Sequence, residues 1–288
     1  MNISQAFYNL LSQLQTQYDE REATAIAHMV MEHLTGGMSK TERILNKNQE
    51  FTAEQTTQYQ SILNELCNGT PVQYVLKEAW FMGMPYFVDP NVLIPRPETE
   101  ELVDWILTDL RKTPANKSNI AILDIGTGSG CIAIALKKAL PAAEITACDI
   151  SSGAIGVAKK NAIRHQAEVN FVVNNFLDEK QWSQLGKFDI IVCNPPYIPT
   201  SKKETMNRNV TDFEPANALF VPDDDPFVFY KAIARFGLQC LNPSGSIYCE
   251  LESSLADDCF SVFDEAGYPN IDLKRDMNYN LRMVKAWR

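Results

Sequence analysis

The chain lacks the long apolar runs that mark membrane proteins, and its first residues do not have the pattern typical of a leader segment. No stretch approaches the roughly 18–20 apolar residues that a membrane-spanning helix needs. The N-terminal sequence, MNISQAFYNLLSQLQTQYDE, has no basic segment and no small-residue cleavage site, which argues against a signal peptide. We therefore expect a cytoplasmic protein that makes no membrane contact.

Paired cysteines are also absent. The seven cysteines include no CxxC pair, and four of them stand singly inside apolar runs: Cys131, Cys148, Cys193 and Cys249. An odd number of isolated cysteines in apolar segments is typical of buried thiols in a reducing compartment. The pattern predicts neither a disulfide framework nor a zinc site, and no metal ion is expected.

Neither part of the chain has a surplus of basic residues. Residues 1–80 carry 5 Lys and Arg against 9 Asp and Glu, and the remaining 208 residues carry 21 against 27, so the net charge is −10. Proteins that bind nucleic acid normally present a basic face, because phosphate neutralisation and counterion release supply much of the affinity. The charge balance argues against direct nucleic-acid binding, without excluding a local basic patch.

Residues 2–67 have the pattern of amphipathic helices. Two capping boxes mark helix starts, Ser39 with Glu42 and Thr52 with Gln55. Apolar residues recur at helical spacing before them: Leu10, Leu11, Leu14, Ala27, Val30, Met31 and Leu34. Residues 1–67 are therefore predicted to form a small all-α domain. Nothing in this domain has a catalytic pattern, and we expect it to serve in substrate recognition.

The pattern changes after Asn68-Gly69-Thr70-Pro71. The following run, VQYVLKEAWFMGMPYFVDPNVLIPR, alternates and is rich in β-branched and aromatic residues, which predicts a hairpin linker over residues 68–96. The next segment, PETEELVDWILTDLRK, predicts a helix that begins at Pro97, with acids in the first turn, where the helix dipole favours them. A loop around Thr113–Ser118 is expected to follow it.

Residues 97–288 are predicted to form one α/β domain. Strands are expected at 120–125, 144–149, 169–173, 188–193 and 246–251, and helices at 130–139, 152–165, 226–240 and 254–266. Strands separated by helices indicate a parallel, doubly wound sheet. The final segment, NIDLKRDMNYNLRMVKAWR, has two strand-like runs around an Asn-Tyr-Asn turn, which predicts an antiparallel hairpin at the sheet edge.

The first expected strand runs into a glycine-rich loop, ILDIGTGSGCIAIAL, with glycines at 126, 128 and 130. Glycines allow a sharp turn and the close approach of a ligand, but many strand-to-helix turns use them. The loop is one residue shorter than the dinucleotide fingerprint at its second interval. Cys131 and Ile132 stand where a Walker loop has Lys and Ser or Thr. Phosphate binding is therefore disfavoured.

Two carboxylates accompany this loop. Asp149 ends the second expected strand and can accept hydrogen bonds from both hydroxyls of a ribose. The alternative role for Asp149 is to cap the helix that follows it, and the glycine loop upstream favours the ribose. Asp124 precedes the first glycine and is expected to anchor the loop backbone and to face an amino group of the ligand.

The motif D-x-G-x-G-x-G at 124–130, together with Asp149, resembles the cofactor site of class I S-adenosylmethionine-dependent methyltransferases. The resemblance implies a cofactor at the switch point of the sheet, with S-adenosylhomocysteine as product. Relatives usually have an acid and an aromatic residue beside the adenine, whereas this chain has Asn175 and Phe176. The cofactor-binding residues implied are Asp124, Gly126, Thr127, Gly128, Ser129, Gly130, Asp149, Asn175, Phe176 and Asn194.

The tetrapeptide Asn194-Pro195-Pro196-Tyr197 follows the fourth expected strand. Such dipeptides also occur in ordinary turns. Beside the cofactor, however, they suit methylation of an amide or aryl-amine nitrogen, whose lone pair is delocalised. The side-chain carbonyl of Asn194 and the backbone carbonyl of Pro195 can accept the two N–H groups, and prolines keep that carbonyl out of a β-ladder. Tyr197 offers an aromatic face to the planar target, so catalysis would consist mainly of positioning.

Three motifs together resemble the protein-(glutamine-N5) methyltransferases that act on peptide chain release factors. They are LIPRPETEELVDW at 93–105, NPPYIP at 194–199 and DFEPANALF at 212–220. The resemblance implies a monomeric enzyme that methylates N5 of the glutamine in the GGQ loop of class 1 release factors. It implies that Asn194, Pro195, Pro196 and Tyr197 hold the substrate amide, with Asn194, Pro195 and Tyr197 as catalytic residues.

Some features leave alternatives open. Relatives commonly have Gly at the position of Lys77, and a Gly-Asp-Gly run where this chain has residues 222–226, PDDDP. The RPETE segment fits a helix start and a cofactor lid equally. The alternative function is methylation of an exocyclic amine, of the N6-adenine type, on DNA or RNA, but it predicts a basic groove. A non-catalytic adaptor is disfavoured because Asn194 and the loop glycines are present.

Overall fold

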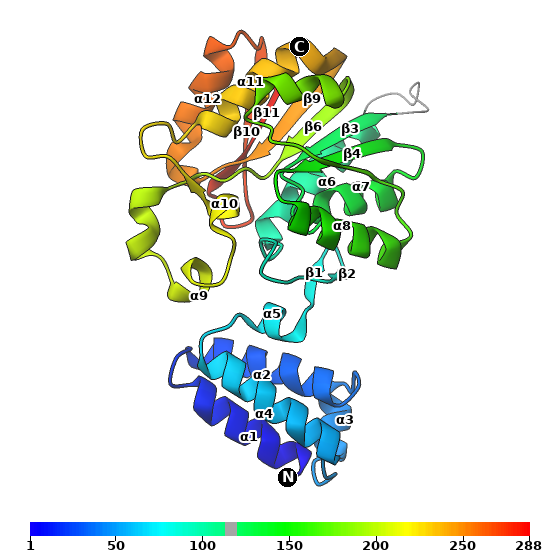
Figure 1. Ribbon diagram of the computed structural model, residues 1–288, viewed down its shortest axis with the longest axis vertical. Helices are drawn as coiled ribbons and strands as arrows, with labels where there is room; N and C mark the ends of the chain where they lie inside the picture. Colours follow the sequence, from blue (N-terminus) through cyan, green and yellow to red (C-terminus); the bar gives the residue numbers. More distant parts are fainter. Residues whose placement is uncertain (113–119) are drawn as a thin grey trace. The chain divides into compact units, whose positions relative to one another are not determined.

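The computed structural model describes residues 1–112 and 120–288, and the loop expected around Thr113–Ser118 lies outside the described residues. The described residues form two compact units (Figure 1). The helical unit consists of Met1–Glu78 and Asn207–Phe213, and the sheet unit consists of Ala79–Met206 and Glu214–Arg288. Each unit has its own apolar core.

The helical unit is built from amphipathic helices around one buried apolar cluster. These helices are α1 (Ile3–Leu14), α2 (Glu20–Leu34), α3 (Lys40–Leu45) and α4 (Ala53–Cys67). Both predicted capping boxes are present, at the starts of α3 and α4, and a further one formed by Asn2 and Gln5 starts α1. The apolar residues that recur at helical spacing form the core, with Leu11 only partly buried. The structure thus confirms the all-α character of this segment.

The segment after Pro71 differs from the expectation of extended structure. Val72–Leu76 forms a short helix, α5, and Val72 is buried in the core of the helical unit. Five residues are too few to separate a strand period from a helix period, so packing decides. Lys77 ends α5 with φ 55° and ψ 33°, a left-handed conformation that glycine adopts without strain. This conformation suits the glycine that the family resemblance implies at the position of Lys77.

A segment distant in sequence completes the helical unit. The helix α9 (Arg208–Thr211) lies against the turn that ends α4. Asn209 Nδ2 donates a hydrogen bond of 3.0 Å to the Tyr18 hydroxyl. Gly69 in the turn has φ 87°, and a Cβ there would lie 3.3 Å from Asn209 Oδ1. A glycine at this position therefore permits the close approach of α9.

The sheet unit begins with the hairpin predicted within 68–96. The strands β1 (Ala79–Phe81) and β2 (Met84–Tyr86) pair antiparallel. The helix α6 spans Pro97–Lys112, so Pro97 is its first residue, as predicted. Glu98 and Glu100 lie in its first turn and Arg111 and Lys112 in its last, the arrangement that the helix dipole favours.

Within the described residues, the main sheet has the strand order β10-β11-β9-β6-β3-β4-β5. The parallel strands are β3 (Ala121–Ile125), β4 (Glu144–Asp149), β5 (Asn170–Val173), β6 (Phe188–Cys193) and β9 (Leu241–Glu250). The strands β10 (Asn270–Arg275) and β11 (Leu281–Trp287) form the antiparallel hairpin at one edge. The predicted doubly wound sheet with a C-terminal hairpin is confirmed, although β9 begins at Leu241 rather than at 246.

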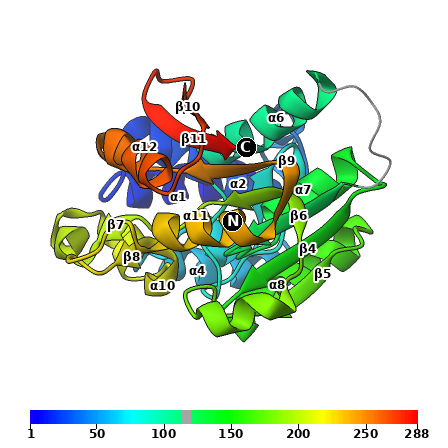
Figure 2. The ribbon, with the colours of Figure 1, turned by 90° about the horizontal axis from the view of Figure 1, so that it is seen from above.

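Helices cover both faces of the sheet (Figures 1 and 2). The helices α6, α7 (Cys131–Ala139) and α8 (Ser152–His165) lie on one face, and α11 (Val228–Cys240) and α12 (Ala256–Glu265) lie on the other. Successive strand residues point to opposite faces, so Ile122 packs toward α6 and α7 whereas Leu123 packs toward α11 and α12. Burial on both faces explains why the parallel strands are continuous apolar runs.

Smaller elements follow β6, among them β7 (Ile198–Pro199), α10 (Ala216–Leu219) and β8 (Phe220–Val221), with β7 and β8 paired in parallel.

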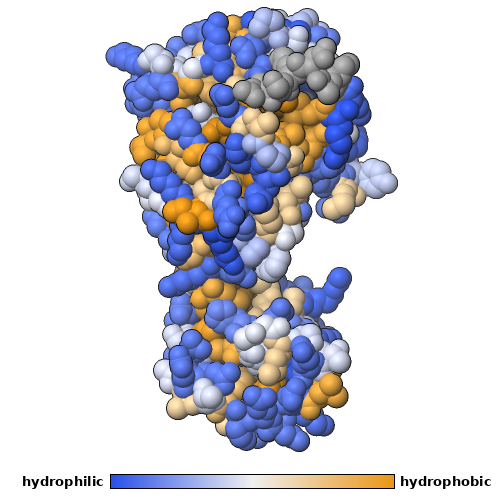
Figure 3. Space-filling model, turned by 90° about the vertical axis from the view of Figure 1, so that its right-hand side faces the viewer, coloured by the Kyte–Doolittle hydropathy of each residue, from blue (hydrophilic) through white to orange (hydrophobic). Residues whose placement is uncertain are grey.

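The cysteines singled out from the sequence are buried free thiols, as predicted. Hydrophilic residues cover much of the face shown in Figure 3. Of the helices in residues 1–112 and 120–288, none combines the length and apolar character needed to cross a membrane.

Candidate active site

A cavity of about 330 Å³ lies in the sheet unit at the carboxyl ends of β3, β4, β5 and β6. The strands β4 and β6 lie on opposite sides of β3, so the cavity occupies the switch point at which open α/β sheets bind ligands. Its volume is in the range of small-molecule sites. The predicted site residues that line it are Gly126, Gly128, Asp149, Asn175, Phe176, Asn194 and Pro196.

The glycine loop follows β3 and turns sharply around the end of β4. The backbone N–H groups of Gly126 and Thr127 donate to the carbonyl of Cys148, at 2.9 and 3.0 Å. Gly126 and Gly128 have φ 70° and 53°, and nothing lies closer than 4.0 Å to the place of a Cβ at either residue. At Gly130, with φ 81°, a Cβ would instead lie 3.1 Å from Ala158 Cβ. The first two glycines therefore leave room beside the cavity, and the third lets α7 approach α8.

The Asp149 carboxylate is fixed at the cavity by backbone donors. Its Oδ2 accepts a hydrogen bond from Gly128 N–H at 3.0 Å, and its Oδ1 accepts one from Ser151 N–H at 2.9 Å. Burial raises the pKa of Asp149, and these donors oppose the rise. The side chain that caps α8 is Ser151, which accepts from Ala154 N–H. The alternative of a helix cap at Asp149 therefore does not hold.

Asp124 lies behind the loop and is completely buried. Its Oδ2 accepts a hydrogen bond of 2.6 Å from the Thr127 hydroxyl, so it anchors the loop. Burial raises its pKa to about 7. Asp124, Thr127, Ser129 and Gly130 are not among the residues that line the cavity. The structure therefore does not show Asp124 facing a ligand.

The end of β5 supplies polar and apolar groups to the cavity. Asn174, which sequence reasoning left out of the site, also lines it; its Nδ2 donates to the Gln181 carbonyl at 3.2 Å. Its buried Oδ1 has no partner within the described part of the chain. The Oδ1 atom of Asn175 accepts a hydrogen bond from Leu177 N–H at 3.3 Å. Phe176 belongs to the core cluster and forms an apolar wall.

The Asn194–Tyr197 segment stays outside any β-ladder, because β6 ends at Cys193 and pairing resumes with Ile198. Asn194 and Pro196 line the cavity, whereas Pro195 and Tyr197 do not. The Tyr197 ring packs against the core on the α11 side, and burial raises its pKa. Only part of the tetrapeptide is therefore brought directly to the cavity.

Two buried residues missed in the sequence are linked to Asn194 by hydrogen bonds, Thr99 directly and Glu250 through Thr99. Asn194 Nδ2 donates to Thr99 Oγ1 at 3.0 Å, and the Thr99 hydroxyl donates to Glu250 Oε2 at 2.6 Å. Thr99 and Glu250 are 3% and 2% exposed. The RPETE segment is thus the start of α6, one of its two proposed roles, and it also holds the side chain of Asn194. No local sequence signal links positions 99, 194 and 250.

Two family models match the chain. The PrmC N-terminal domain matches residues 5–76, and the methyltransferase small domain matches residues 104–214. A release factor glutamine methyltransferase from Flavobacterium psychrophilum is 38% identical over 269 residues, which cover 93% of each chain. One from Bacteroides thetaiotaomicron is 36% identical over 275 residues, or 96% of each chain. The chain belongs to the release factor glutamine methyltransferase family.

Solved structures support the fold of this family member at lower sequence identity. The hMettl16 catalytic domain, solved in complex with the MAT2A 3′UTR hairpin 6, has a TM-score of 0.54 and 18% identity, covering 82% of each chain. A methyltransferase from Pyrococcus furiosus has a TM-score of 0.50 and 16% identity, covering 72% of this chain and 89% of its own. The chain is therefore a methyltransferase in fold as well as in family.

In this release factor glutamine methyltransferase, one buried carboxylate joins two of the three motifs that resemble the family, those at 93–105 and 212–220. Glu214, of the DFEPANALF motif, is 5% exposed and forms an ion pair with Arg96. Its Oε2 also accepts a hydrogen bond of 3.1 Å from Ile94 N–H. The contact places the residues after Glu214 at the cavity, which Pro215, Asn217 and Phe220 line. Among residues 1–112 and 120–288, no group of three or more side chains is arranged to hold a metal ion.

Proposed function

We propose that the enzyme transfers a methyl group from S-adenosylmethionine to N5 of the glutamine in the GGQ loop of class 1 release factors. The observation that carries the proposal is the Asn194 amide. Thr99 fixes its NH₂ group at the cavity, and its carbonyl oxygen accepts no hydrogen bond from the described residues. A primary amide presents two N–H donors, which a fixed acceptor can hold. The names of the relatives support this substrate.

The donor set of the cavity suits S-adenosylmethionine. Asp149 keeps free lone pairs that could accept the ribose hydroxyls, the open faces of Gly126 and Gly128 would admit the ligand, and Phe176 would bound the adenine. Asn175 would accept from the adenine amino group. The unpartnered Oδ1 of Asn174 is a further buried acceptor that a polar ligand would satisfy. The cofactor supplies a methyl group on a cationic sulfur, which is electrophilic without a metal ion.

The residues of the tetrapeptide would position the nucleophile. Asn194 Oδ1 and the Pro195 carbonyl would accept the two N–H groups of the target amide, so that its nitrogen lone pair is directed at the methyl carbon. Transfer would form a nitrogen–carbon bond and break the carbon–sulfur bond, leaving the bonding electron pair on sulfur and releasing one proton from the amide nitrogen to solvent. Tyr197 packs its ring against the core but is only partly buried, and its uncovered part is proposed to bound the planar amide. Holding the reacting atoms in line is the main contribution of such a site.

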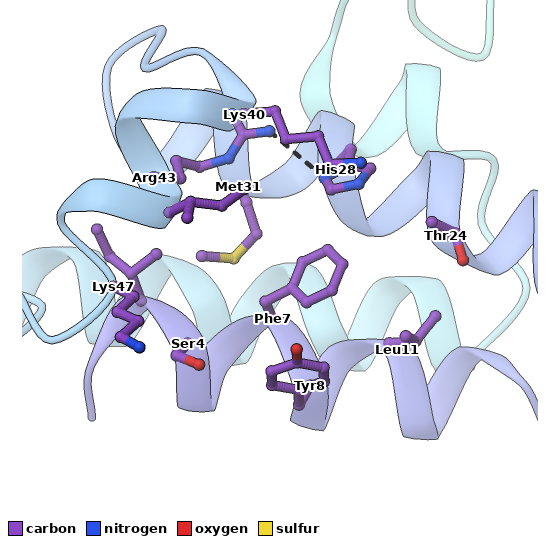
Figure 4. A pocket seen from close by; sticks show the side chains of 12 residues that line it. Ser4, Phe7, Tyr8, Leu11, Thr24, His28, Met31, Lys40, Arg43 and Lys47 are labelled. Atoms are coloured by element: carbon purple, nitrogen blue, oxygen red, sulfur yellow. Dashed lines mark hydrogen bonds between the residues drawn. The ribbon is translucent and has the colours of Figure 1, made fainter.

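The helical unit is proposed to dock the release factor, since a three-residue loop alone offers too small a surface for specificity. A groove of about 510 Å³ lies between α1, α2 and α3 (Figure 4). Phe7, Leu11 and Met31 supply apolar side chains to this groove. Tyr8 and Ile44 at its edge are 66% and 60% exposed. Such a groove is suited to the apolar stripe of a helix.

Cations lie along one side of this groove, on α3 and just after it, although the chain as a whole is acidic. Lys40, Arg43 and Lys47 line it, and Lys40 and Lys47 form no ion pair with any residue that the structure describes. The pKa of His28 is lowered by burial and by Lys40 and Arg43, which keeps it neutral and leaves the lysines as the exposed charges. The charge pattern favours a release-factor segment with an apolar stripe flanked by acids.

Reversing the two exposed charges, Lys40→Glu with Lys47→Glu, is expected to raise KM for the intact release factor about fivefold, because complementary rim charges assist association. KM for a short GGQ peptide should not change, since the peptide lacks the segment that is proposed to occupy the groove. Steady-state methylation with both substrates measures this. The control is Arg21→Glu with Lys77→Glu, an equal charge change at exposed positions outside the groove. Equal effects on both substrates, or an equal effect of the control, would contradict docking at the groove.

Methyl transfer from labelled S-adenosylmethionine tests the proposed function itself. The acceptors compared are purified release factor, its GGQ→GGA form, and total DNA and RNA. Label should appear on the release factor and vanish with the glutamine. Label on nucleic acid instead would favour an exocyclic-amine methyltransferase and overturn the proposal. We propose that the enzyme is a monomer and that it binds no nucleic acid. We also propose that it works in the cytoplasm, where translation factors act.

A further inference from the structure

A chain of buried hydrogen bonds connects Asn194 to a carboxylate on a neighbouring strand. Asn194 follows β6, Thr99 is in the first turn of α6, and Glu250 ends β9. Cys193 and Cys249 pair across β6 and β9, so Asn194 and Glu250, the residues that follow them, lie side by side at the carboxyl ends of these strands. Thr99 lies between them, with its hydroxyl 3.0 Å from Asn194 Nδ2 and 2.6 Å from Glu250 Oε2.

The Thr99 hydroxyl determines which group donates and which accepts in this series of hydrogen bonds. Thr99 has one proton, and an ionised Glu250 can only accept, so the proton lies between Thr99 and Glu250. The oxygen of Thr99 is then an acceptor toward Asn194, and only the NH₂ half of the amide can satisfy it. The carbonyl oxygen of Asn194 is consequently turned away from Thr99. A protonated Glu250 could donate to Thr99 instead, which would free the Thr99 proton and allow the amide to rotate.

We propose that Glu250, acting through Thr99, is a positioning group that sets which half of the Asn194 amide faces the substrate. The inference deepens the proposed function and rests on it, since it assigns an orientation to the group that holds the target nitrogen. When Asn194 Oδ1 faces the substrate, it can accept a hydrogen bond from an N–H group of the glutamine amide. If the Asn194 NH₂ group faced the substrate instead, two donors would meet and no hydrogen bond could form. The relay thus selects a primary amide and disfavours a side chain that only accepts, such as glutamate.

The surroundings of Glu250 make the relay sensitive to pH near neutrality. Burial raises the pKa of Glu250 to about 7; the Thr99 hydrogen bond, Arg282 and Arg96 oppose the rise, and Glu98 adds to it. Tyr197 and Cys193 are the other titratable neighbours, and burial raises the pKa of both, so they stay neutral. The Tyr230 hydroxyl donates to the Glu250 backbone carbonyl and not to the carboxylate. The relay requires ionised Glu250, so kcat should rise with pH through about 7.

The substitution Thr99→Val tests the relay, because it keeps the shape of the side chain and removes the hydroxyl. We expect kcat for the release factor to fall roughly 10- to 100-fold, the scale of a misplaced reacting group, while cofactor affinity stays within about twofold. Thr99→Ser should restore most of the rate because it keeps the hydroxyl. Thr108→Val, a half-buried threonine on the same helix, is the matched control and should leave kcat unchanged. An unchanged kcat in Thr99→Val, or no rescue by Thr99→Ser, would overturn the proposal.

A spectroscopic measurement separates this inference from the proposed function. The side-chain NH₂ signal of Asn194 is identified in the NMR spectrum of the wild type by its loss in Asn194→Ala. It should shift with pH around 7 in the wild type and lose that shift in Glu250→Gln, an isosteric variant that cannot ionise. This readout needs no methyl transfer, so it stands even if the release factor is not the substrate. If the chemical shift of the Asn194 NH₂ signal in the wild type did not change with pH around 7, the proposed relay would be wrong.

Discussion

Asn194→Ala should lower kcat for the release factor about 10²- to 10³-fold and leave the affinity for S-adenosylmethionine within about twofold. The expected size is that of losing one preorganised polar contact to the reacting group. Asn194 is held by Thr99 at the cavity, so its oxygen would orient the target nitrogen. A contact that acts on orientation affects kcat more than ground-state binding. Single-turnover methylation together with calorimetric titration of the cofactor measures the two quantities.

Asn217→Ala is the matched control for this substitution. Asn217 also lines the cavity, but it is exposed and lies on the segment after Glu214. Its loss should change kcat by less than about threefold, as a surface substitution outside such a network does. If Asn194→Ala lost cofactor affinity and kept its kcat, the assignment of Asn194 to the substrate amide would be wrong.

Asp149→Ala should weaken S-adenosylmethionine binding about 100-fold, or about 2.7 kcal/mol. The carboxylate would accept two ribose hydroxyls, and hydrogen bonds to a charged group contribute about 1.5–3 kcal/mol each. The substitution also removes the acceptor that holds Gly128 N–H, so the loop loses one of its anchors. Calorimetric titration with S-adenosylmethionine and with S-adenosylhomocysteine should show similar losses, because both share the ribose.

The matched control for Asp149 is Asp19→Ala. Asp19 also accepts two backbone N–H groups, those of Arg21 and Glu22, but it caps α2 in the helical unit. Its loss should lower stability by about 1 kcal/mol, as for other helix caps, and leave cofactor affinity unchanged. Cofactor affinity that survives Asp149→Ala would place the ribose elsewhere in the cavity.

The two largest expected effects thus concern different quantities: Asn194→Ala should lower kcat, and Asp149→Ala should lower the affinity for the cofactor. Asp149 ends β4 and is proposed to bind the cofactor, whereas Asn194 lies after β6 and is proposed to face the substrate. The Glu214–Arg96 contact joins the segment over the cavity to the start of α6, which also carries Thr99. The start of α6 therefore contacts both the segment that lines the cavity after Glu214 and the side chain of Asn194. The sequence suggests only a helix start or a cofactor lid for this segment.

The sequence alone determined the elements that depend on neighbouring residues. Alternation of apolar strands and helices predicted the parallel sheet, and the bounds expected for β4, β6 and α8 match the structure. The carboxyl ends of parallel strands gather at one edge, so a glycine loop, Asp149 and Asn194 at strand ends were expected to converge. The cavity at that edge brings together Gly126, Asp149 and Asn194.

Only the tertiary structure decided the contacts between distant elements. Thr99 and Glu250 are 151 positions apart, and Asn209 and Tyr18 are 191 positions apart, so no periodicity or spacing connects them. Tyr197 has its ring against the core, and Val72–Leu76 is helical, because burial outweighs the local pattern in both places. Local propensities fix which element forms and where it ends. Which side chain stands beside Asn194 depends on how β6, β9 and α6 pack, and only the folded chain determines that.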